Sequence, residues 1–149
     1  MRALSIHQPW AWAILQAGKT IENRTWSTKY RGPILVHASK SRASYDREKQ
    51  LDWKALYGVD LPPWEELATG AVVGVVDVVD CVSPTSSRAI RLNPWTEGPV
   101  CWVLANPRLL PQPVPFRGAQ LLFEVADELI PTLSPNSVLE VGQRFPDSP

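Results

Sequence analysis

The valine-rich stretch Gly70–Val82 (GAVVGVVDVVDCV) places the strongest constraint on how this chain folds. Since β-branched side chains favour extended backbone and alternate between the two faces of a strand, the stretch predicts a long β-strand with valines on both faces. Such a strand is buried on both sides, as in a barrel or a sheet covered by helices. Gly74 within it indicates a bulge or the close approach of another backbone.

Asp77 and Asp80 bring carboxylates into this apolar strand. A carboxylate among valines needs a partner, or its pKa rises. Asp77 shares the face of Val73, Val75 and Val79 and is the more interior of the two, so it is a candidate for a working acid. Asp80 lies near the strand end and is expected to serve a turn.

The remaining patterns predict a β-rich α+β fold. Pro9 and Gly18 bracket an apolar helix, and a second helix is expected over 42–57, capped by Ser41 and ended by Gly58. In this second helix Tyr45, Leu51, Trp53 and Leu56 are expected to face inward. Further strands are expected at 4–6, 34–38, 100–105 and 121–126, and 83–97 is expected to form a mobile loop over or beside a site.

Length and composition narrow the class of protein. A chain of 149 residues suits one domain, predicted over 1–133, with a loosely packed tail over 134–149. No apolar run is long enough to span a bilayer, and the N-terminus lacks the pattern of a signal peptide, so we expect a cytoplasmic protein. Cys81 and Cys101 form no zinc motif, so neither a metal nor a cofactor is expected. The expected state is a monomer or a weak dimer.

The stretch Gln16–Trp26 concentrates charge beside apolar elements. If 20–26 is a strand, Glu22, Arg24 and Trp26 share one face, with Lys19 in the preceding turn. An acceptor, a planar donor fork and a stacking surface suit a polar planar ligand such as a nucleobase. The alternative is a solvated ion pair without a ligand.

Other polar and aromatic residues extend this binding hypothesis. Trp10, Trp12 or Trp26 would stack on a base, and basic residues would follow a phosphate backbone. His37, at a strand end, is also compatible with a purely structural role. The further candidate binding residues are Gln8, Lys29, Arg31, His37, Lys40, Arg108 and Arg117. Because fifteen basic and fifteen acidic residues leave no net charge, only a local basic patch is expected, and affinity should be modest and salt-sensitive.

Several of these segments resemble the ASCH family (activating-signal-cointegrator homology domains), in particular its small endothelium-and-lymphocyte-associated members. The hallmark is similar to Gly18–Arg24 (GKTIENR). Further similar segments are 4–10 (LSIHQPW), 34–38, 70–77, 104–108 and 113–118, so that the resemblance covers about Leu4 to Ile130. It implies a PUA-like β-barrel flanked by two or three helices, with a cleft that accepts RNA or a nucleobase.

The same resemblance implies a possible enzymatic activity. Some small bacterial members remove an acyl group from N4-acetylcytidine, using a Lys, a Thr nucleophile and a Glu. The family Lys corresponds to Lys19, but the Thr position holds Glu22, which cannot act as that nucleophile. Binding of RNA or a modified nucleoside is therefore the leading hypothesis. The alternatives are an RNA-directed or N4-acylcytidine hydrolase that uses Lys19 with Glu22 or Asp77, and a protein-interaction scaffold supported only by the Pro-rich segment 107–115.

Overall fold

The computed structural model describes residues 1–129 and 139–140. The α-helices are α1 (Trp10–Gln16), α2 (Ala43–Glu48), α3 (Trp53–Tyr57) and α4 (Arg88–Leu92), with 3-10 turns at Trp64–Glu66 and Asp127–Leu129. The strands are β1 (Arg2–Ile6), β2 (Ile21–Arg24), β3 (Gly32–Ala38), β4 (Ala71–Val82), β5 (Val100–Pro115), β6 (Leu122–Glu124) and β7 (Leu139–Glu140). In this part of the chain no helix has the length and apolar character needed to cross a membrane.

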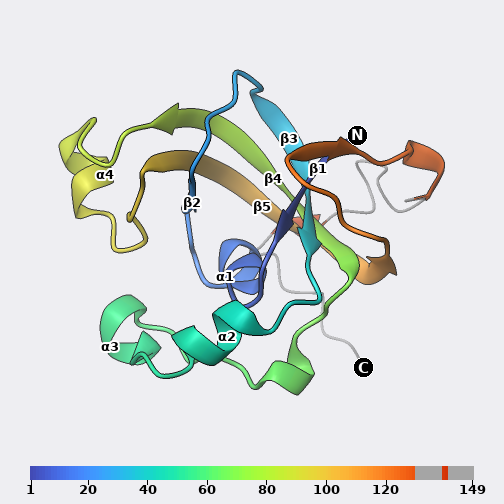
Figure 1. The fold of residues 1–149 in the computed structure, drawn as a ribbon, viewed down its shortest axis with the longest axis horizontal. Helices are drawn as coiled ribbons and strands as arrows, with labels where there is room; N and C mark the ends of the chain where they lie inside the picture. Colours follow the sequence, from blue (N-terminus) through green and yellow to red (C-terminus); the bar gives the residue numbers. More distant parts are fainter. Residues whose placement is uncertain (130–138, 141–149) are drawn as a thin grey trace.

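One curled sheet organises these elements, in the order β2-β5-β4-β3-β1-β6, with β7 on β5 (Figure 1). β1 and β3 run parallel, and the other pairs are antiparallel. Within the described residues β2 and β6 do not pair with each other, so the sheet forms a half-barrel rather than a closed barrel. The predicted β-rich α+β class is confirmed, and the described residues form four α-helices where two or three were expected.

β4 is buried on both faces along its first half, as the valine pattern predicts. Val73, Val76 and Val78 join one core cluster with α1, whereas Val72 and Val75 join a second cluster on the other face. The register against β5 shifts after Val72, Val75 and Val78, so the pairing of the two strands is irregular. Asp77 lies half-buried, where it pairs with Arg108 and accepts a hydrogen bond from Asn106 Nδ2 at 2.9 Å.

At Gly74, β4 lies close against both β5 and α1. A Cβ there would lie 2.5 Å from the Arg108 carbonyl oxygen and 2.7 Å from both methyl groups of Leu15. We expect Gly74→Ala to destabilise the protein by about 1–3 kcal/mol, because backbone and a packed side chain must both shift. Urea unfolding measures this. Ser86→Ala, on an exposed turn, is the control. Gly58→Ala would not serve, because Gly58 has a φ of 71°, which strains any other residue. An unchanged midpoint for Gly74→Ala would contradict the close approach.

Four local predictions need correction. The helix expected over 42–57 is two helices, because the Asp52 carboxylate accepts from Ala55 N at 3.1 Å and starts α3 anew. Leu51 and Leu56, expected inside, are 46% and 51% exposed. The N-cap position of α2 is Arg42, one residue later than predicted, while the Ser41 hydroxyl accepts from Ala43 N at 3.3 Å. The segment 83–97 contains α4 and is hydrogen-bonded to β2 through Asn23.

Other expectations hold at the ends of the elements. Gly58 ends α3 in the left-handed conformation, at φ 71°, as its position predicts. By contrast, β5 continues through the Pro-rich segment to Pro115, beyond the strand expected at 100–105. Of the predicted tail over 134–149, residues 134–138 and 141–149 lie outside the described residues, and Leu139–Glu140 pairs with Arg108 and Leu109 of β5.

Candidate functional site

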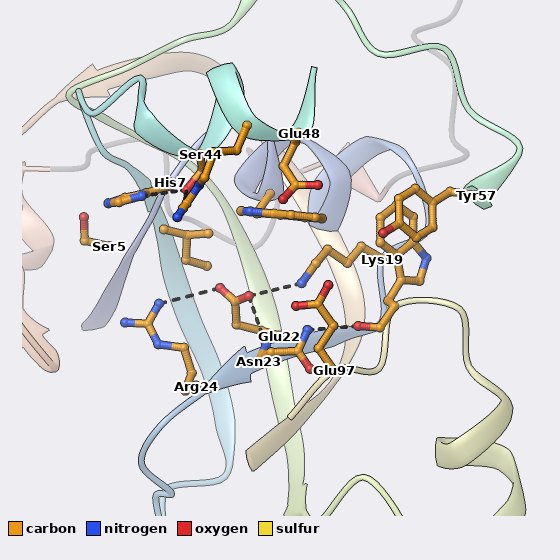
Figure 2. A pocket seen from close by; sticks show the side chains of 14 residues that line it. Ser5, His7, Lys19, Glu22, Asn23, Arg24, Ser44, Glu48, Tyr57 and Glu97 are labelled. Carbon is orange, nitrogen blue, oxygen red and sulfur yellow. Dashed lines mark hydrogen bonds and ion pairs between the residues drawn. The ribbon is translucent and has the colours of Figure 1, made fainter. Parts of the chain in front are cut away.

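A cavity of about 610 Å³ opens between β2, α2, α3 and the segment that follows α4 (Figure 2). Its walls combine acids, bases and aromatic rings from parts of the chain far apart in sequence. The lining residues are Ser5, Ile6, His7, Trp10, Lys19, Glu22, Asn23, Arg24, Ser44, Arg47, Glu48, Tyr57, Trp95 and Glu97. Trp10, Lys19, Glu22 and Arg24 are the sequence-predicted site residues that this cavity brings together.

Lys19 is buried at the floor of this cavity, with 3% of its surface exposed. Gly18, at φ 75°, turns the chain after α1, and Lys19 N donates to Ala13 O at 3.1 Å. The ammonium donates to the Ile21 carbonyl and to Glu22 Oε1, the latter at 3.1 Å, and lies 5.4 Å from the centre of the Trp10 ring. The buried charge is therefore satisfied by an acid, a carbonyl and an aromatic face.

Glu22 and Arg24 project from the same face of β2, as the strand period predicts. Glu22 is 6% exposed, and its Oε2 lies 3.7 Å from Arg24 Nη1. Lys19, Glu22 and Arg24 thus form a continuous cation–acid–cation row, visible in Figure 2. Trp26, expected on the same face, instead packs edge-on against Trp102 outside the cavity lining, with ring centres 4.8 Å apart.

Asn23 attaches the segment after α4 to β2. Its Nδ2 donates to Trp95 O at 2.9 Å, and its Oδ1 accepts from the backbone N–H groups of Glu97 and Gly98, both at 2.9 Å. Asn93 Nδ2 adds a bond to Thr20 Oγ1 at 2.9 Å. These contacts hold Trp95 and Glu97 at the cavity wall.

We expect Asn23→Ala to destabilise the protein by about 1–3 kcal/mol, because it leaves two N–H groups and one carbonyl without partners. The amides of Glu97 and Gly98 should lose protection in hydrogen exchange, while the amides of β4 keep theirs. Gln50→Ala, at an exposed position, is the control. Protection at Glu97 that survives Asn23→Ala would show that the segment is held by other contacts.

Aromatic rings form one end of the cavity. Tyr57 stacks on Trp95 with ring centres 3.8 Å apart and an interplanar angle of 9°. Trp53 packs behind this pair and against Trp10, at 5.6 Å from Trp95 and 5.1 Å from Trp10. Because Trp53 is buried, with 2% of its surface exposed, it supports the other rings from behind.

Acidic and basic groups from α2 and the 93–98 segment form the rim. Burial, reinforced by the charge of Glu97, raises the pKa of Glu48, while Arg47 opposes the shift. Burial and the charges of Glu97 and Glu48 also raise the pKa of Tyr57. The rim therefore holds a carboxyl that takes up a proton more readily than a free one. On the opposite side His7 Nδ1 lies 2.9 Å from Ser44 Oγ.

The remaining predicted residues do not line this cavity. The Gln8 amide bridges Ala68 O and Trp12 N, both at 2.9 Å, and so holds α1 in place. Trp12 lines a separate, smaller cavity with Gln8. Lys29 is exposed, Arg31 pairs with Asp80 at 3.4 Å, and the Asp77–Arg108 pair lies on β4 and β5. His37, Lys40 and Arg117 line another cavity.

Sequence reasoning missed most of the cavity's other walls. His7, Ser44, Arg47, Glu48, Tyr57, Trp95 and Glu97 line it, and Asn23 places two of them. Arg47 and Glu48 lie in a charge-rich helix whose sequence is typical of a solvated surface. Their place at the cavity depends on tertiary packing, which the local sequence does not show. Trp95 and Glu97 carry a usable signal, since the sequence predicts that 83–97 lies over or beside a site.

The arrangement gathers hydrogen-bond donors, acceptors and aromatic rings around one cavity. Within residues 1–129 and 139–140 no group of three or more His, Cys, Asp or Glu side chains is placed to hold a metal ion. The cavity volume lies in the range typical of sites for small molecules, about 300–1,000 Å³. Its polar side chains lie at the floor and the rim, and the aromatic rings of Trp10, Tyr57 and Trp95 lie beside them.

Comparisons with known proteins agree with this architecture. The family model described as "ASCH domain" matches residues 4–113. Activating signal cointegrator 1 of Homo sapiens and that of Mus musculus are each 25% identical to this chain over 130 residues. The match covers 85% of this chain and 22% of either relative, so the chain spans about a fifth of their length. The fold, the GKTIENR segment at the cavity floor and the extent of the match together place this chain in the ASCH domain family.

Proposed function

We propose that this protein binds RNA by enclosing one nucleobase in the cavity floored by Lys19, Glu22 and Arg24. The row of alternating charges carries the proposal, because a base edge presents both donors and acceptors. The family membership supports it, since the ASCH resemblance implies a cleft for RNA or a nucleobase.

The floor has hydrogen-bonding capacity left for such a base. Lys19 carries three N–H donors, of which Ile21 O and Glu22 Oε1 take two. Among the described residues, Glu22 Oε2 has only the 3.7 Å contact with Arg24, so it can accept from an exocyclic amine. Arg24 is 24% exposed at its side chain and can donate to a ring nitrogen or a carbonyl. The row is complementary to a base edge with a donor between two acceptors, as uracil presents. Cytosine, with one donor followed by two acceptors, can pair with Glu22 and one neighbouring cation.

The aromatic end of the cavity supplies the apolar contribution. Tyr57 and Trp95 already stack on each other, so the base would meet their edges or the exposed part of Trp10. Contacts of bases with aromatic side chains contribute about 1–3 kcal/mol per base. With no net charge on the chain, these contacts would contribute much of the affinity.

The experiment is a binding titration with two kinds of probe. One is a set of nucleosides, namely adenosine, cytidine, guanosine, uridine and N4-acetylcytidine; the other is a pool of single-stranded RNA 12-mers of random sequence. Glu22→Gln, nearly isosteric, should weaken both the preferred nucleoside and RNA by about tenfold or more, because the acceptor is replaced by an amide. Glu65→Gln, at an exposed position, is the matched control. Equal RNA binding by both variants would overturn the proposal.

A second candidate is an amidohydrolase acting on N4-acylated cytidine, and the raised pKa of Glu48 favours it. In this reading Glu48 holds a proton for the leaving amine, and Lys19 stabilises negative charge on the carbonyl oxygen. Water adds to the acyl carbon, giving acetate and cytidine. Asp77 has no place in this reaction, since it does not line the cavity and pairs with Arg108. Chromatography for cytidine after incubation with N4-acetylcytidine tests this candidate, with Glu48→Gln, which removes the proton donor, as the variant expected to be inactive.

A further inference from the structure

A second cavity, of about 780 Å³, lies at the end of the sheet where β3, the start of β4 and the chain after β5 meet. Two of its lining residues, Lys40 and Arg117, are exposed cations. Within the described residues no Asp or Glu lines it, and neither cation has an ion-pair partner. We call this second cavity the basic cavity. In the cavity around Lys19 and Glu22, called here the nucleobase cavity, the positive charges of Lys19, Arg24 and Arg47 are instead balanced by the negative charges of Glu22, Glu48 and Glu97.

Ser5 joins the two cavities, because it lines both. In Figure 2 it lies at the opposite end of the nucleobase cavity from Tyr57. A chain leaving that cavity at this end would therefore pass Ser5 and enter the basic one. The two cavities therefore border each other at Ser5.

The basic cavity is held in shape by buried hydrogen bonds. His37 is 2% exposed, and its Nε2 donates to Phe116 O at 2.6 Å. The other ring nitrogen, Nδ1, lies 3.0 Å from Ser5 Oγ and, in this tautomer, accepts from the Ser5 hydroxyl. His37 thus positions Ser5 and the 116–118 turn together, a structural role rather than contact with a ligand.

Two glycines allow the cations to reach this place. A Cβ at Gly118 would lie 2.7 Å from the His37 ring, so only glycine lets the turn that carries Arg117 rest on it. A Cβ at Gly70 would lie 2.5 Å from Cε of Lys40, whose stem crosses that glycine. Gly70 N donates to Ala38 O at 2.7 Å and Phe116 N to Gly70 O at 3.1 Å, which ties the three segments together.

From this geometry we infer that the basic cavity binds the phosphodiester next to the enclosed base, so that the ligand is a continuous single strand of RNA rather than a free nucleoside. Lys40 and Arg117 contact the phosphate oxygens, and Ser5 marks the crossing between the cavities. Phe116, half-buried and stacked on Phe123 at 6.2 Å, offers a ring beside the phosphate for the next base. This inference rests on the proposed function, whose cavity holds the first base.

The test compares Lys40→Ala/Arg117→Ala with Lys54→Ala/Arg91→Ala, which removes the same charge from exposed positions outside both cavities. Removing the two cations of the basic cavity should weaken binding of the RNA 12-mers on the order of tenfold, as expected when one or two charge-assisted hydrogen bonds to phosphate are removed. The preferred nucleoside should bind with an unchanged Kd. The slope of log K against log salt should become shallower by about 0.7 for each phosphate that the variant no longer neutralises.

Methylphosphonate RNA, whose linkages carry no charge, should bind both double variants equally. RNA affinity that is the same in the two double variants would overturn the inference and leave the nucleobase cavity standing. If RNA binding depends on Lys40 and Arg117 but not on Glu22, the proposed function is overturned, and the basic cavity is still supported as a phosphate site. If inorganic phosphate binds the basic cavity but Lys40→Ala/Arg117→Ala leaves RNA affinity unchanged, the inference is also overturned. Absence of binding to every probe would overturn both.

Discussion

Trp102→Ala is expected to lower the free energy of unfolding by about 3–5 kcal/mol, because it opens a large cavity where the sheet is most crowded. Trp102 is fully buried, lies on β5 opposite Glu22 of β2, and packs edge-on against Trp26. Its indole N–H donates to Trp26 O at 3.0 Å, so the substitution also leaves a carbonyl without its partner. A loss of this size is a large fraction of the stability of a typical domain, about 5–15 kcal/mol.

Urea unfolding followed by circular dichroism measures the effect of Trp102→Ala without relying on tryptophan fluorescence. Trp102→Phe keeps most of the apolar volume and removes the hydrogen bond, so it should cost roughly 1–2 kcal/mol and stay folded if the alanine variant does not. Trp64→Ala, in a half-buried 3-10 turn, should cost clearly less than Trp102→Ala. Similar losses of stability for Trp64→Ala and Trp102→Ala would contradict the packing at β5.

The strand pattern could be predicted because its signal is local. The valines of β4 specify burial on both faces, and the observed clusters on either side of the sheet confirm this. The period of β2 likewise places Glu22 and Arg24 on one face, and their 3.7 Å contact agrees. The period does not specify the partner strand, so it predicts neither the register shifts between β4 and β5 nor the pairing of Asp77 with Arg108.

The helical side of the molecule was harder to predict because its boundaries depend on competition between neighbouring signals. Asp52 is an N-cap residue in the middle of a helix-favouring stretch, and its hydrogen bond to Ala55 N decides where α3 begins. The break moves Leu51 and Leu56 to the surface and leaves Trp53 inside. With α2 separated from α3, Glu48 lines the cavity although its neighbours along the chain are solvated. No spacing rule distinguishes Glu48 from Asp46, which faces solvent.

The candidate site illustrates the same limit over longer distances. Asn23 looks like an ordinary polar residue on the far face of β2, yet it bonds Trp95, Glu97 and Gly98 across more than seventy residues of sequence. Ser5 and His37 are adjacent in register on β1 and β3, so their contact follows once the parallel pairing is known. The convergence of two cavities at Ser5 requires the full three-dimensional arrangement.

Lys19→Met is expected to be the most damaging change at the site, lowering the free energy of unfolding by about 3–5 kcal/mol. The reason is that Glu22, 6% exposed, then keeps a buried charge with only the 3.7 Å contact to Arg24 and one backbone N–H from Asn23. Glu22→Gln should cost less, about 1–3 kcal/mol, because the Gln amide oxygen can still accept from the Lys19 ammonium. The two changes therefore differ in stability although they break the same ion pair.

A double-mutant cycle with Lys19→Met and Glu22→Gln separates the ion pair from its surroundings. Once Lys19 is gone, neutralising Glu22 removes the buried charge, so the double variant should be more stable than Lys19→Met alone. Urea unfolding of the four proteins at neutral pH gives the cycle, and Lys54→Met, at an exposed position paired with Asp60, is the control. Additive losses of stability would show that Lys19 and Glu22 are not coupled. Because Lys19 also bonds Ile21 O and faces the Trp10 ring, and Glu22 also contacts Arg24, a remaining destabilisation of the double variant reports these other contacts and not the ion pair.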